Sequence, residues 1–330
     1  MSRLRLLPMF VFLLAVACGE KPSAESSAGS SAGAKAPAAA RLRIAMVPKG
    51  TTHVFWKAVE SGARQAADEL GVDLVWKGPL SENDRAGQIQ LVQQLLAEKV
   101  DGLALAPLDH QALVAPVAAA TAQGIPVVIF DSALDGTAGK DFAAFVATDN
   151  QAAGRMGGEH LAKLLEGDAG VVLLRYQVGS ASTEARETGF LEAMADAGVK
   201  VLVNNRYAGP TVGEATTTAL NMAEPLRAAG GIFCSNESAT NGMLLALRQM
   251  GLAGTKRFVG FDASPALVEA LQQGEIDALV VQDPRRMGYK ALEAVVRRVR
   301  GELVDPITDT GAVVVTRDQL EDPAIRRLVE

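Results

Sequence analysis

Short apolar runs alternate with helical patterns from residue 41 to the end of the chain, and this alternation limits the possible folds more than any other feature. It is typical of β-α-β units, in which each strand joins a parallel sheet and the following helix packs on that sheet. Runs such as Gly102-Leu-Ala-Leu-Ala106 contain no polar side chain, as expected for a strand buried on both faces. The pattern predicts strands over residues 42–47, 72–76, 102–106, 125–130, 170–174, 199–202, 231–234, 258–261, 277–282 and 312–315.

The rhythm of strands and helices starts again after residue 150, so the sequence predicts two α/β lobes, each a doubly wound, Rossmann-like parallel sheet. A body of this length normally divides into two domains. The last expected elements, strands 277–282 and 312–315 and the helix 286–300, are too few for a third domain. We expect them to complete the two sheets, so that several crossings between the lobes act as a hinge.

The first forty residues carry targeting signals. Two arginines precede an apolar run that is too short to span a bilayer, which predicts a secretory signal peptide over residues 1–17. The run ends in Leu14-Ala-Val-Ala-Cys18, which resembles the lipobox of bacterial lipoproteins, although Ala15 stands where leucine is most frequent. We expect lipidation of Cys18; the alternative is an ordinary cleavage site with Cys18 as a bystander. We expect residues 18–40 to form a flexible tether, and we expect the protein to be exported to the periplasm or cell surface and anchored to the membrane by its lipid.

Composition and motifs argue against several function classes. The formal net charge is -6 and lysines and arginines do not cluster, so no nucleic-acid partner is expected. His53, His110 and His160 lie on different elements without metal-ligand spacing, and the chain has neither a phosphate-binding loop nor a Gly-x-Ser-x-Gly elbow. We therefore expect no metal, no cofactor and no enzymatic activity, with paired catalytic carboxylates at Asp131 and Asp262 as the alternative.

Polar side chains follow the expected strands at their carboxyl ends, where ligands bind in open parallel α/β sheets. Carboxylate, amide and guanidinium groups suit hydrogen bonds to several hydroxyls, and an aromatic ring can stack on the apolar face of a sugar. Phe55 also lies on the apolar stripe of its helix and fits the core nearly as well, whereas Trp56 lies off that stripe and is the better candidate for ligand contact. Singly, an aspartate after a strand is often a helix cap, and Arg186 could be a surface ion-pair partner. The expected ligand-binding residues are Lys49, Thr52, His53, Phe55, Trp56, Asp131, Ser132, Arg186, Asn236, Asp262 and Gln282.

Several stretches together resemble one family. They are Phe55-Trp56 with Gly62-Ala63 downstream, 124–131 (GIPVVIFD), 147–150 (ATDN), 186–190 (RETGF), 233–237 (FCSNE), 259–262 (VGFD) and Val281-Gln282. Over residues 41–316 the chain resembles the periplasmic ribose-type sugar-binding proteins, relatives of the ligand-binding domain of lactose-repressor-like regulators. The resemblance implies sugar contacts by Phe55, Trp56, Asp131, Arg186, Asn236, Asp262 and Gln282. It also implies a type I periplasmic binding protein fold whose three-segment hinge crosses near Thr148, Gln282-Asp283 and Asp309, with domains of 41–147 plus 283–309 and 148–282 plus 310–330.

The resemblance also implies partners. They are a small sugar or polyol, an ABC permease with its ATPase, or alternatively a chemoreceptor or sensor kinase, and the protein itself is expected to be a monomer. A transcription regulator of the same fold would need a helix-turn-helix before the first strand, which residues 19–40 cannot form.

The sequence departs from the ribose binders at two expected contacts. Ser132 stands where they have arginine, and His53 where they have asparagine. Val47-Pro-Lys49, Lys77-Gly-Pro79 and 87–91 (GQIQL) are instead similar to the autoinducer-2 and rhamnose-binding branch, in which the lysine contacts the ligand. The ligand therefore stays open between a monosaccharide, autoinducer-2 and a deoxysugar.

Overall fold

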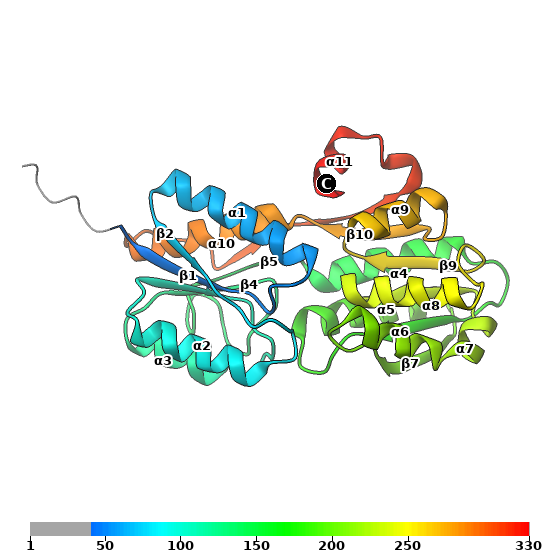
Figure 1. The fold of residues 1–330 in the computed structure, drawn as a ribbon, viewed down its shortest axis with the longest axis horizontal. Coiled ribbons are helices and arrows are strands. Elements are labelled where there is room, and N and C mark those ends of the chain that lie inside the picture. Colours follow the sequence, from blue (N-terminus) through cyan, green and yellow to red (C-terminus); the bar gives the residue numbers. More distant parts are fainter. Residues whose placement is uncertain (1–40, 330) are drawn as a thin grey trace, which may run out of the picture. The chain divides into compact units, whose positions relative to one another are not determined.

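Two six-stranded sheets carry the fold (Figure 1). The computed structural model describes residues 41–329, so the expected signal peptide, lipidated Cys18 and tether lie outside the described residues. Both sheets belong to one compact unit that begins at Arg41. We call each sheet with its covering helices a lobe, the first lobe being the one that contains β1.

The first sheet has the strand order β11-β5-β4-β3-β1-β2, and all its pairs are parallel. Its strands are β1 Arg43–Val47, β2 Asp73–Trp76, β3 Gly102–Leu105, β4 Val127–Phe130, β5 Ala144–Ala147 and β11 Ile307–Asp309. The second sheet has the order β12-β10-β9-β8-β6-β7, in which β12 alone runs antiparallel to its neighbour. Its strands are β6 Val171–Arg175, β7 Val201–Tyr207, β8 Gly231–Cys234, β9 Arg257–Phe261, β10 Ala278–Gln282 and β12 Ala312–Thr316.

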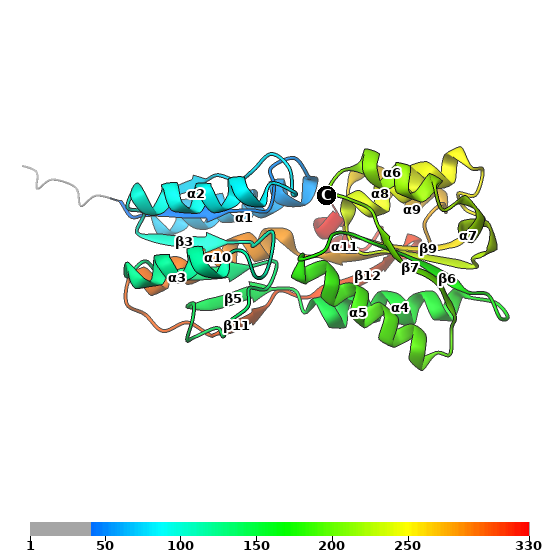
Figure 2. The same cartoon turned by 90° about the horizontal axis from the view of Figure 1, so that it is seen from below.

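Each sheet is buried on both faces by helices, which is why its strands read as continuous apolar runs. Along β1, Ile44 and Met46 pack with residues of α1 and α10, whereas Ala45 and Val47 pack with residues of α2 and α3. Figure 2 shows these four helices beside the first sheet. In the second lobe α4 and α5 cover one face, and α6, α8 and α9 cover the other. The helices are α1 Val54–Leu70, α2 Arg85–Ala97, α3 Val114–Ala122, α4 Asn150–Leu164, α5 Ala181–Asp196, α6 Val212–Leu220, α7 Ala223–Ala228, α8 Glu237–Gln249, α9 Pro265–Gln273, α10 Pro284–Val299 and α11 Pro323–Val329.

In each lobe, a glycine allows the backbones of two neighbouring helices to come into direct contact. A Cβ at Gly62 of α1 would lie 1.9 Å from the carbonyl oxygen of Arg285 in α10, and one at Gly154 of α4 would lie 1.9 Å from that of Arg186 in α5. A larger residue at either glycine would therefore push the two helices apart. The first pair positions the start of α1, and the second positions Arg186.

The chain crosses between the lobes three times. It passes from β5 to α4, from β10 to α10 and from β11 to β12. Two of the crossings are tied together, since the Thr148 hydroxyl lies 3.5 Å from that of Thr310 and donates to the Gly311 carbonyl oxygen at 3.1 Å. The predicted fold class, two doubly wound lobes joined by a three-segment hinge, is confirmed.

Some elements differ from the sequence-based expectations. The strands β5 and β11 and the helix α11 were not predicted. The strand β11 consists of Ile-Thr-Asp without an apolar run. The strand expected over 199–202 begins at Val201 and continues through polar residues to Tyr207, because it lies at the exposed edge of its sheet. Among residues 41–329, no helix is both long enough and apolar enough to cross a membrane.

Candidate ligand-binding site

A cavity of about 30 Å³ lies between the lobes and is lined by side chains that follow the carboxyl ends of strands from both sheets. Nearly all the predicted ligand-binding residues meet there; Thr52 and Ser132 do not line the cavity. The lining side chains are Lys49, His53, Phe55, Trp56, Glu82 and Asp131 from the first lobe, and Tyr176, Ser182, Thr183, Arg186, Asn236, Asp262 and Gln282 from the second.

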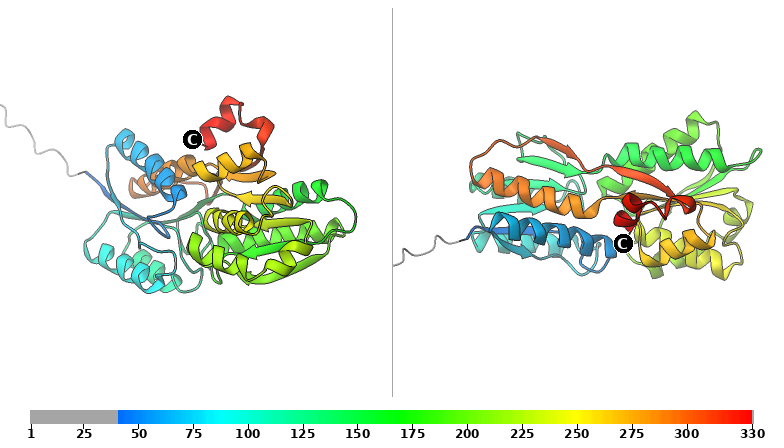
Figure 3. Two further views of the ribbon diagram at one scale, coloured as in Figure 1. Left: turned by 45° about the vertical axis from the view of Figure 1, so that its right-hand side comes forward. Right: turned by 90° about the horizontal axis from the view of Figure 1, so that it is seen from above.

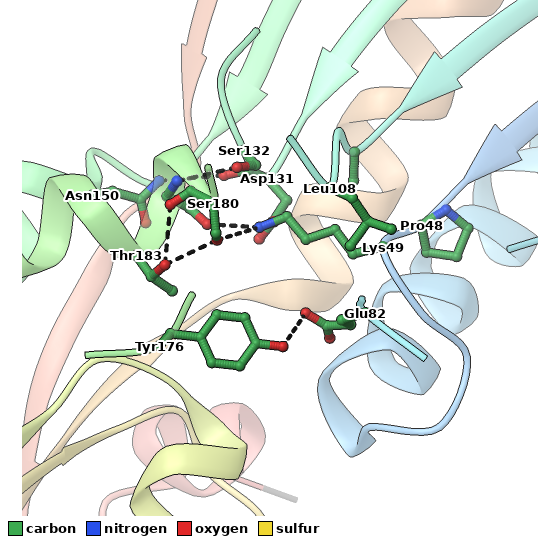
Figure 4. A network of polar contacts seen from close by, with 12 residues as sticks. Pro48, Lys49, Glu82, Leu108, Asp131, Ser132, Asn150, Tyr176, Ser180 and Thr183 are labelled. Atoms are coloured by element: carbon green, nitrogen blue, oxygen red, sulfur yellow. Dashed lines mark hydrogen bonds and ion pairs between the residues drawn. The ribbon is translucent and has the colours of Figure 1, made fainter. Parts of the chain in front are cut away.

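Lys49 reaches from the loop after β1 toward the second lobe (Figure 4). Its ammonium group lies 3.2 Å from the Asp131 carboxylate and donates to the hydroxyls of Ser182 at 2.9 Å and Ser180 at 3.3 Å. The buried Gln88 fixes the loop, because its amide nitrogen donates to the Pro48 carbonyl oxygen at 3.0 Å. Lys49 is thus a buried cation held by partners from both lobes.

Glu82 is the centre of a second cross-lobe network. It accepts hydrogen bonds from the Trp56 indole at 2.7 Å and from the hydroxyl of Tyr176, in the second lobe, at 2.8 Å (Figure 4), and its carboxylate lies 2.9 Å from His53. Burial disfavours charge on both partners, but the hydrogen bond and charge between them outweigh it. The pKa of His53 is raised to about 9 and that of Glu82 is lowered to about 2, so both are charged at neutral pH.

Trp56 and Phe55 occupy places opposite to those that the helical stripe suggested. Trp56 is 3% exposed and packs edge-on against Phe130 in the first-lobe core, whereas Phe55 is only partly buried. The expectation that Trp56 lies off the buried stripe was wrong, because the buried face of α1 runs through Trp56, Val59 and Ala63 at helical spacing. The indole N–H of Trp56 is satisfied by Glu82. Both residues still have atoms at the cavity.

Asp131 and Asp262 occupy equivalent positions in the two lobes. Each directly follows a strand and adopts the left-handed region, with φ of 61° and 67°, which is uncommon for a residue other than glycine. The amide of Asp131 donates to Val146 of β5, and that of Asp262 donates to Val280 of β10. This shared backbone turn aims one carboxylate from each lobe at the cavity, and such strained conformations concentrate at functional sites.

Arg186 is a buried guanidinium in the second lobe. Its Nε donates to the Asn150 side chain at 2.8 Å, its Nη1 donates to the Ser235 carbonyl oxygen at 3.0 Å, and its Cζ lies 3.9 Å from the Phe261 ring centroid. Burial lowers the pKa of Arg186, although the charges of Asp262 and Asp131 act in the opposite direction. These contacts hold the guanidinium plane in one orientation, so it can donate directionally.

Asp262, Gln282 and Asn236 complete the second-lobe side of the cavity. Asp262 accepts from the Gln282 amide at 2.6 Å and from the Glu237 backbone at 3.1 Å, and its pKa is raised because burial outweighs the charge of Arg186. The Gln282 side-chain oxygen is buried and has no hydrogen-bond partner among the described residues. Asn236 caps α8 by accepting from Ala239 at 3.2 Å. The unsatisfied oxygen of Gln282 is an acceptor for a hydroxyl group.

Thr52 and Ser132 have other contacts. Thr52 is exposed and donates to the Leu80 carbonyl oxygen at 3.4 Å, away from the cavity. Ser132 is buried and accepts a hydrogen bond at 3.1 Å from the backbone of Ser182 in the second lobe. Ser132 therefore joins the lobes directly, where the resemblance placed an arginine in the ribose binders.

Four lining residues were not predicted: Glu82, Tyr176, Ser182 and Thr183. Glu82 lies in the loop after β2, and Tyr176 directly follows β6. Applying the strand-end rule to the second strand, and to every polar residue after β6, would have found Glu82 and Tyr176. Ser182 and Thr183 gave no such signal, because they lie in the first turn of α5.

Within residues 41–329, no group of three or more histidine, cysteine, aspartate or glutamate side chains is arranged to hold a metal ion.

Comparison with known proteins places the chain in a family. The family described as periplasmic binding protein domain matches residues 44–303. The D-allose-binding periplasmic protein of Escherichia coli (strain K12) is 31% identical over 268 residues, which cover 80% of this chain and 86% of that protein. The structure of a carbohydrate transporter solute-binding protein from Agrobacterium radiobacter in complex with D-arabinose is similar with a TM-score of 0.84 and 31% identity, covering 88% of this chain and 100% of that one. The structure of an ABC transporter solute-binding protein from Agrobacterium vitis with bound D-fucose is similar with a TM-score of 0.83 and 31% identity, covering 87% of this chain and 100% of that one. The chain belongs to the periplasmic binding protein family.

Proposed function

We propose that this protein captures a monosaccharide or a similar polyol between its two lobes and delivers it to an ABC permease and its ATPase. The observation that carries the proposal is the convergence of carboxylate, amide and guanidinium groups from strand ends of both lobes on one cavity. The relatives that bind D-allose, D-arabinose and D-fucose support a sugar as the ligand.

The lining groups make different kinds of contact with a polyol. Asp131 and Asp262 accept hydrogen bonds from ligand hydroxyls, and Arg186 and Lys49 donate to ligand oxygens. Phe55 supplies an apolar surface for the C–H face of the ring. With these charges balanced within the site, a neutral ligand is favoured over an ionic one. The site holds the ligand without transforming it, and we infer that the protein is not an enzyme.

The hinge links ligand binding to delivery, because closure of the two lobes accompanies binding and changes the outline that a permease meets. We propose that residues 41–147 plus 283–309 and residues 148–282 plus 310–330 move as the two bodies. Ligand shifts the equilibrium toward the closed form by the difference between its affinities for the closed and the open form. A permease that recognises the closed outline then distinguishes loaded from empty protein.

A thermal-shift screen tests the proposal. A ligand that binds the folded state alone raises the melting temperature, so pentoses, hexoses, 6-deoxysugars, polyols and autoinducer-2 are compared at equal concentration. We expect stabilisation by at least one neutral sugar or polyol. Absence of any shift across these compounds would contradict a sugar-binding role.

A 6-deoxysugar is the second candidate ligand. The relative from Agrobacterium vitis was solved with D-fucose, which lacks the 6-hydroxyl of galactose. In the same screen, stronger stabilisation by D-fucose than by D-galactose would favour this candidate, and the reverse order would exclude it.

We also propose that the protein is exported and anchored to the membrane through lipidated Cys18. The sequence of residues 1–18 supports this proposal. Metabolic labelling with a radioactive fatty acid tests it: the natural chain should take up label and Cys18→Ser should not. Unlabelled natural chain would leave Cys18 as a bystander. Loss of sugar uptake in a strain without the protein would favour transport, and intact uptake with lost chemotaxis or signalling would favour a sensor.

A further inference from the structure

A groove of about 490 Å³ lies beside the candidate sugar site. The starts of α1 and α10, the helix α9 and the C-terminal segment from Leu320 to Val329 form its walls. Figure 3 shows this C-terminal segment lying beside β10 and α9. Ile325, Leu328 and Val329 pack against the second-lobe core, so the wall that α11 supplies is fixed to the fold. This wall lies beyond residue 303, where the family match ends.

The groove adjoins the candidate site through shared lining residues. Phe55, Asp262 and Gln282 line both spaces. Asp262 and Gln282 are buried, and the side-chain oxygen of Gln282 has no hydrogen-bond partner among the described residues. A ligand hydroxyl that bonds to Asp262 and Gln282 therefore sits next to the groove, and a substituent on that side of the ring can enter it.

The chemistry of the groove suits a neutral, partly apolar group. Val54, Ala58, Val268, Val281 and Leu328 give it apolar walls. Charged lining residues of both signs edge these walls, with Arg285, Arg326 and Arg327 beside Asp262, Glu269, Asp283 and Glu321. An apolar surface edged by polar groups fits a second ring, either sugar or aryl, rather than an ion.

We propose that the protein binds glycosides as well as free sugars, with the sugar ring in the inter-lobe cavity and the second ring in the groove between α1, α9 and α11. The inference rests on the proposed sugar-binding function and extends its substrate class. It assigns the groove residues Ala58, Val268 and Gln272 to specificity for the group linked to the sugar.

Calorimetric titration of the natural protein is the first test. The probes are D-ribose, D-allose and D-arabinose, each as the free sugar and as the two anomers of its phenyl glycoside. We expect one phenyl glycoside to bind with an affinity equal to or higher than that of its free sugar. If free sugars bind and no phenyl glycoside does, the inference is overturned while the proposed function stands. If neither class binds, the proposed function fails as well.

Substitutions that fill the groove locate the second ring. Gln272 is exposed and lines the groove, whereas the neighbouring Gln273 is exposed and does not, so Gln272→Trp and Gln273→Trp form a matched pair. Gln272→Trp should weaken phenyl glycoside binding about tenfold and leave the free sugar unchanged, because it occupies space that only the second ring uses. Gln273→Trp should change neither.

A second pair covers the opposite wall. Ala58→Trp in α1 should act like Gln272→Trp, with Lys57→Trp, at an exposed position outside the groove, as its control. A melting temperature equal to that of the natural protein shows that each variant is folded. Equal loss of free sugar and glycoside, or no loss of either, in both groove variants would contradict the proposed position of the second ring.

Discussion

The two walls of the candidate site are built differently. In the first lobe, the polar groups are occupied: Glu82 is bonded to Trp56, His53 and Tyr176, and Lys49 contacts Asp131 and two serines. Tyr176 and both serines come from the second lobe. In the second lobe, Arg186, Asp262 and Gln282 are positioned by contacts within that lobe, and the Gln282 oxygen has no partner among the described residues.

This difference separates two tasks. The second-lobe wall keeps its arrangement when the lobes separate, so we expect it to bind the ligand first. The first-lobe wall exchanges bonds with the second lobe on opening, so we expect it to determine how firmly the site closes. The following predictions test this division, from the largest expected effect to the smallest.

The first-lobe wall depends on Trp56. Trp56→Ala should lower the free energy of unfolding by about 3–5 kcal/mol, because it leaves a cavity in the core and removes a donor from the buried Glu82. Urea unfolding measures the loss. Trp76→Ala, at a half-buried position away from the cavity, is the control and should cost less. Equal stability of Trp56→Ala and the natural protein would contradict the core position of Trp56.

The second-lobe wall depends on Asp262. Asp262→Ala should weaken sugar binding by about 2–5 kcal/mol, since it removes a charged acceptor and leaves Arg186 with one fewer buried counter-charge. Titration calorimetry with the best sugar of the screen measures the change. Asp168→Ala, at an exposed position outside the cavity, should bind normally. Unchanged affinity of Asp262→Ala would make Asp262 a purely structural residue.

The charged pair of the first lobe predicts a pH dependence of folding. The pKa of His53 rises from 6.5 to about 9 on folding, so its stabilisation is complete below pH 6.5 and is lost as the pH rises through 9. The pKa of Glu82 falls from 4.5 to about 2 on folding, so the stabilisation that Glu82 contributes is complete above pH 4.5 and is lost as the pH falls through 2. Between pH 6.5 and 9, the loss of the His53 charge should lower the free energy of unfolding of the natural protein by at most about 3 kcal/mol.

The variant His53→Gln isolates this dependence. It should show a smaller loss of stability between pH 6.5 and 9 than the natural protein. His160→Gln is the control, because burial and Lys163 lower the pKa of His160, and its removal should not reduce the loss. Parallel curves for the natural protein and His53→Gln would contradict the charged state of His53.

The smallest expected effect concerns closure alone. Tyr176→Phe removes the cross-lobe hydrogen bond to Glu82, which should favour the open form and weaken sugar binding by about 1.5 kcal/mol, roughly tenfold. Tyr207→Phe, on an exposed strand outside the cavity, is the matched control and should have no effect. A Tyr176→Phe variant with normal affinity would show that this contact does not contribute to closure.

Much of this architecture could be predicted from local patterns. Parallel strands buried on both faces leave continuous apolar runs, and polar residues at their carboxyl ends identified Asp131, Asp262 and Gln282. The pattern failed where tertiary contacts decide. The helical pattern could not show that the Trp56 indole donates to Glu82, because that contact depends on a loop distant in sequence.

The same limitation applies between the lobes. The bonds from Tyr176 to Glu82 and from Ser182 to Ser132 join residues whose proximity depends on how the two lobes meet. No sequence spacing encodes such contacts. The strand β11 was missed for another reason, since it is held in the sheet by pairing with β5 rather than by apolar side chains of its own.

Hydrogen exchange with and without a saturating sugar tests the central claim most directly, namely that one ligand is held by both lobes. The sugar is the one that most stabilises the protein in the thermal-shift screen. We predict slower exchange in both lobes, at the loop after β1 and the end of β4 in the first and at the ends of β9 and β10 in the second. Slower exchange confined to one lobe, or at sites away from these strand ends, would contradict the account.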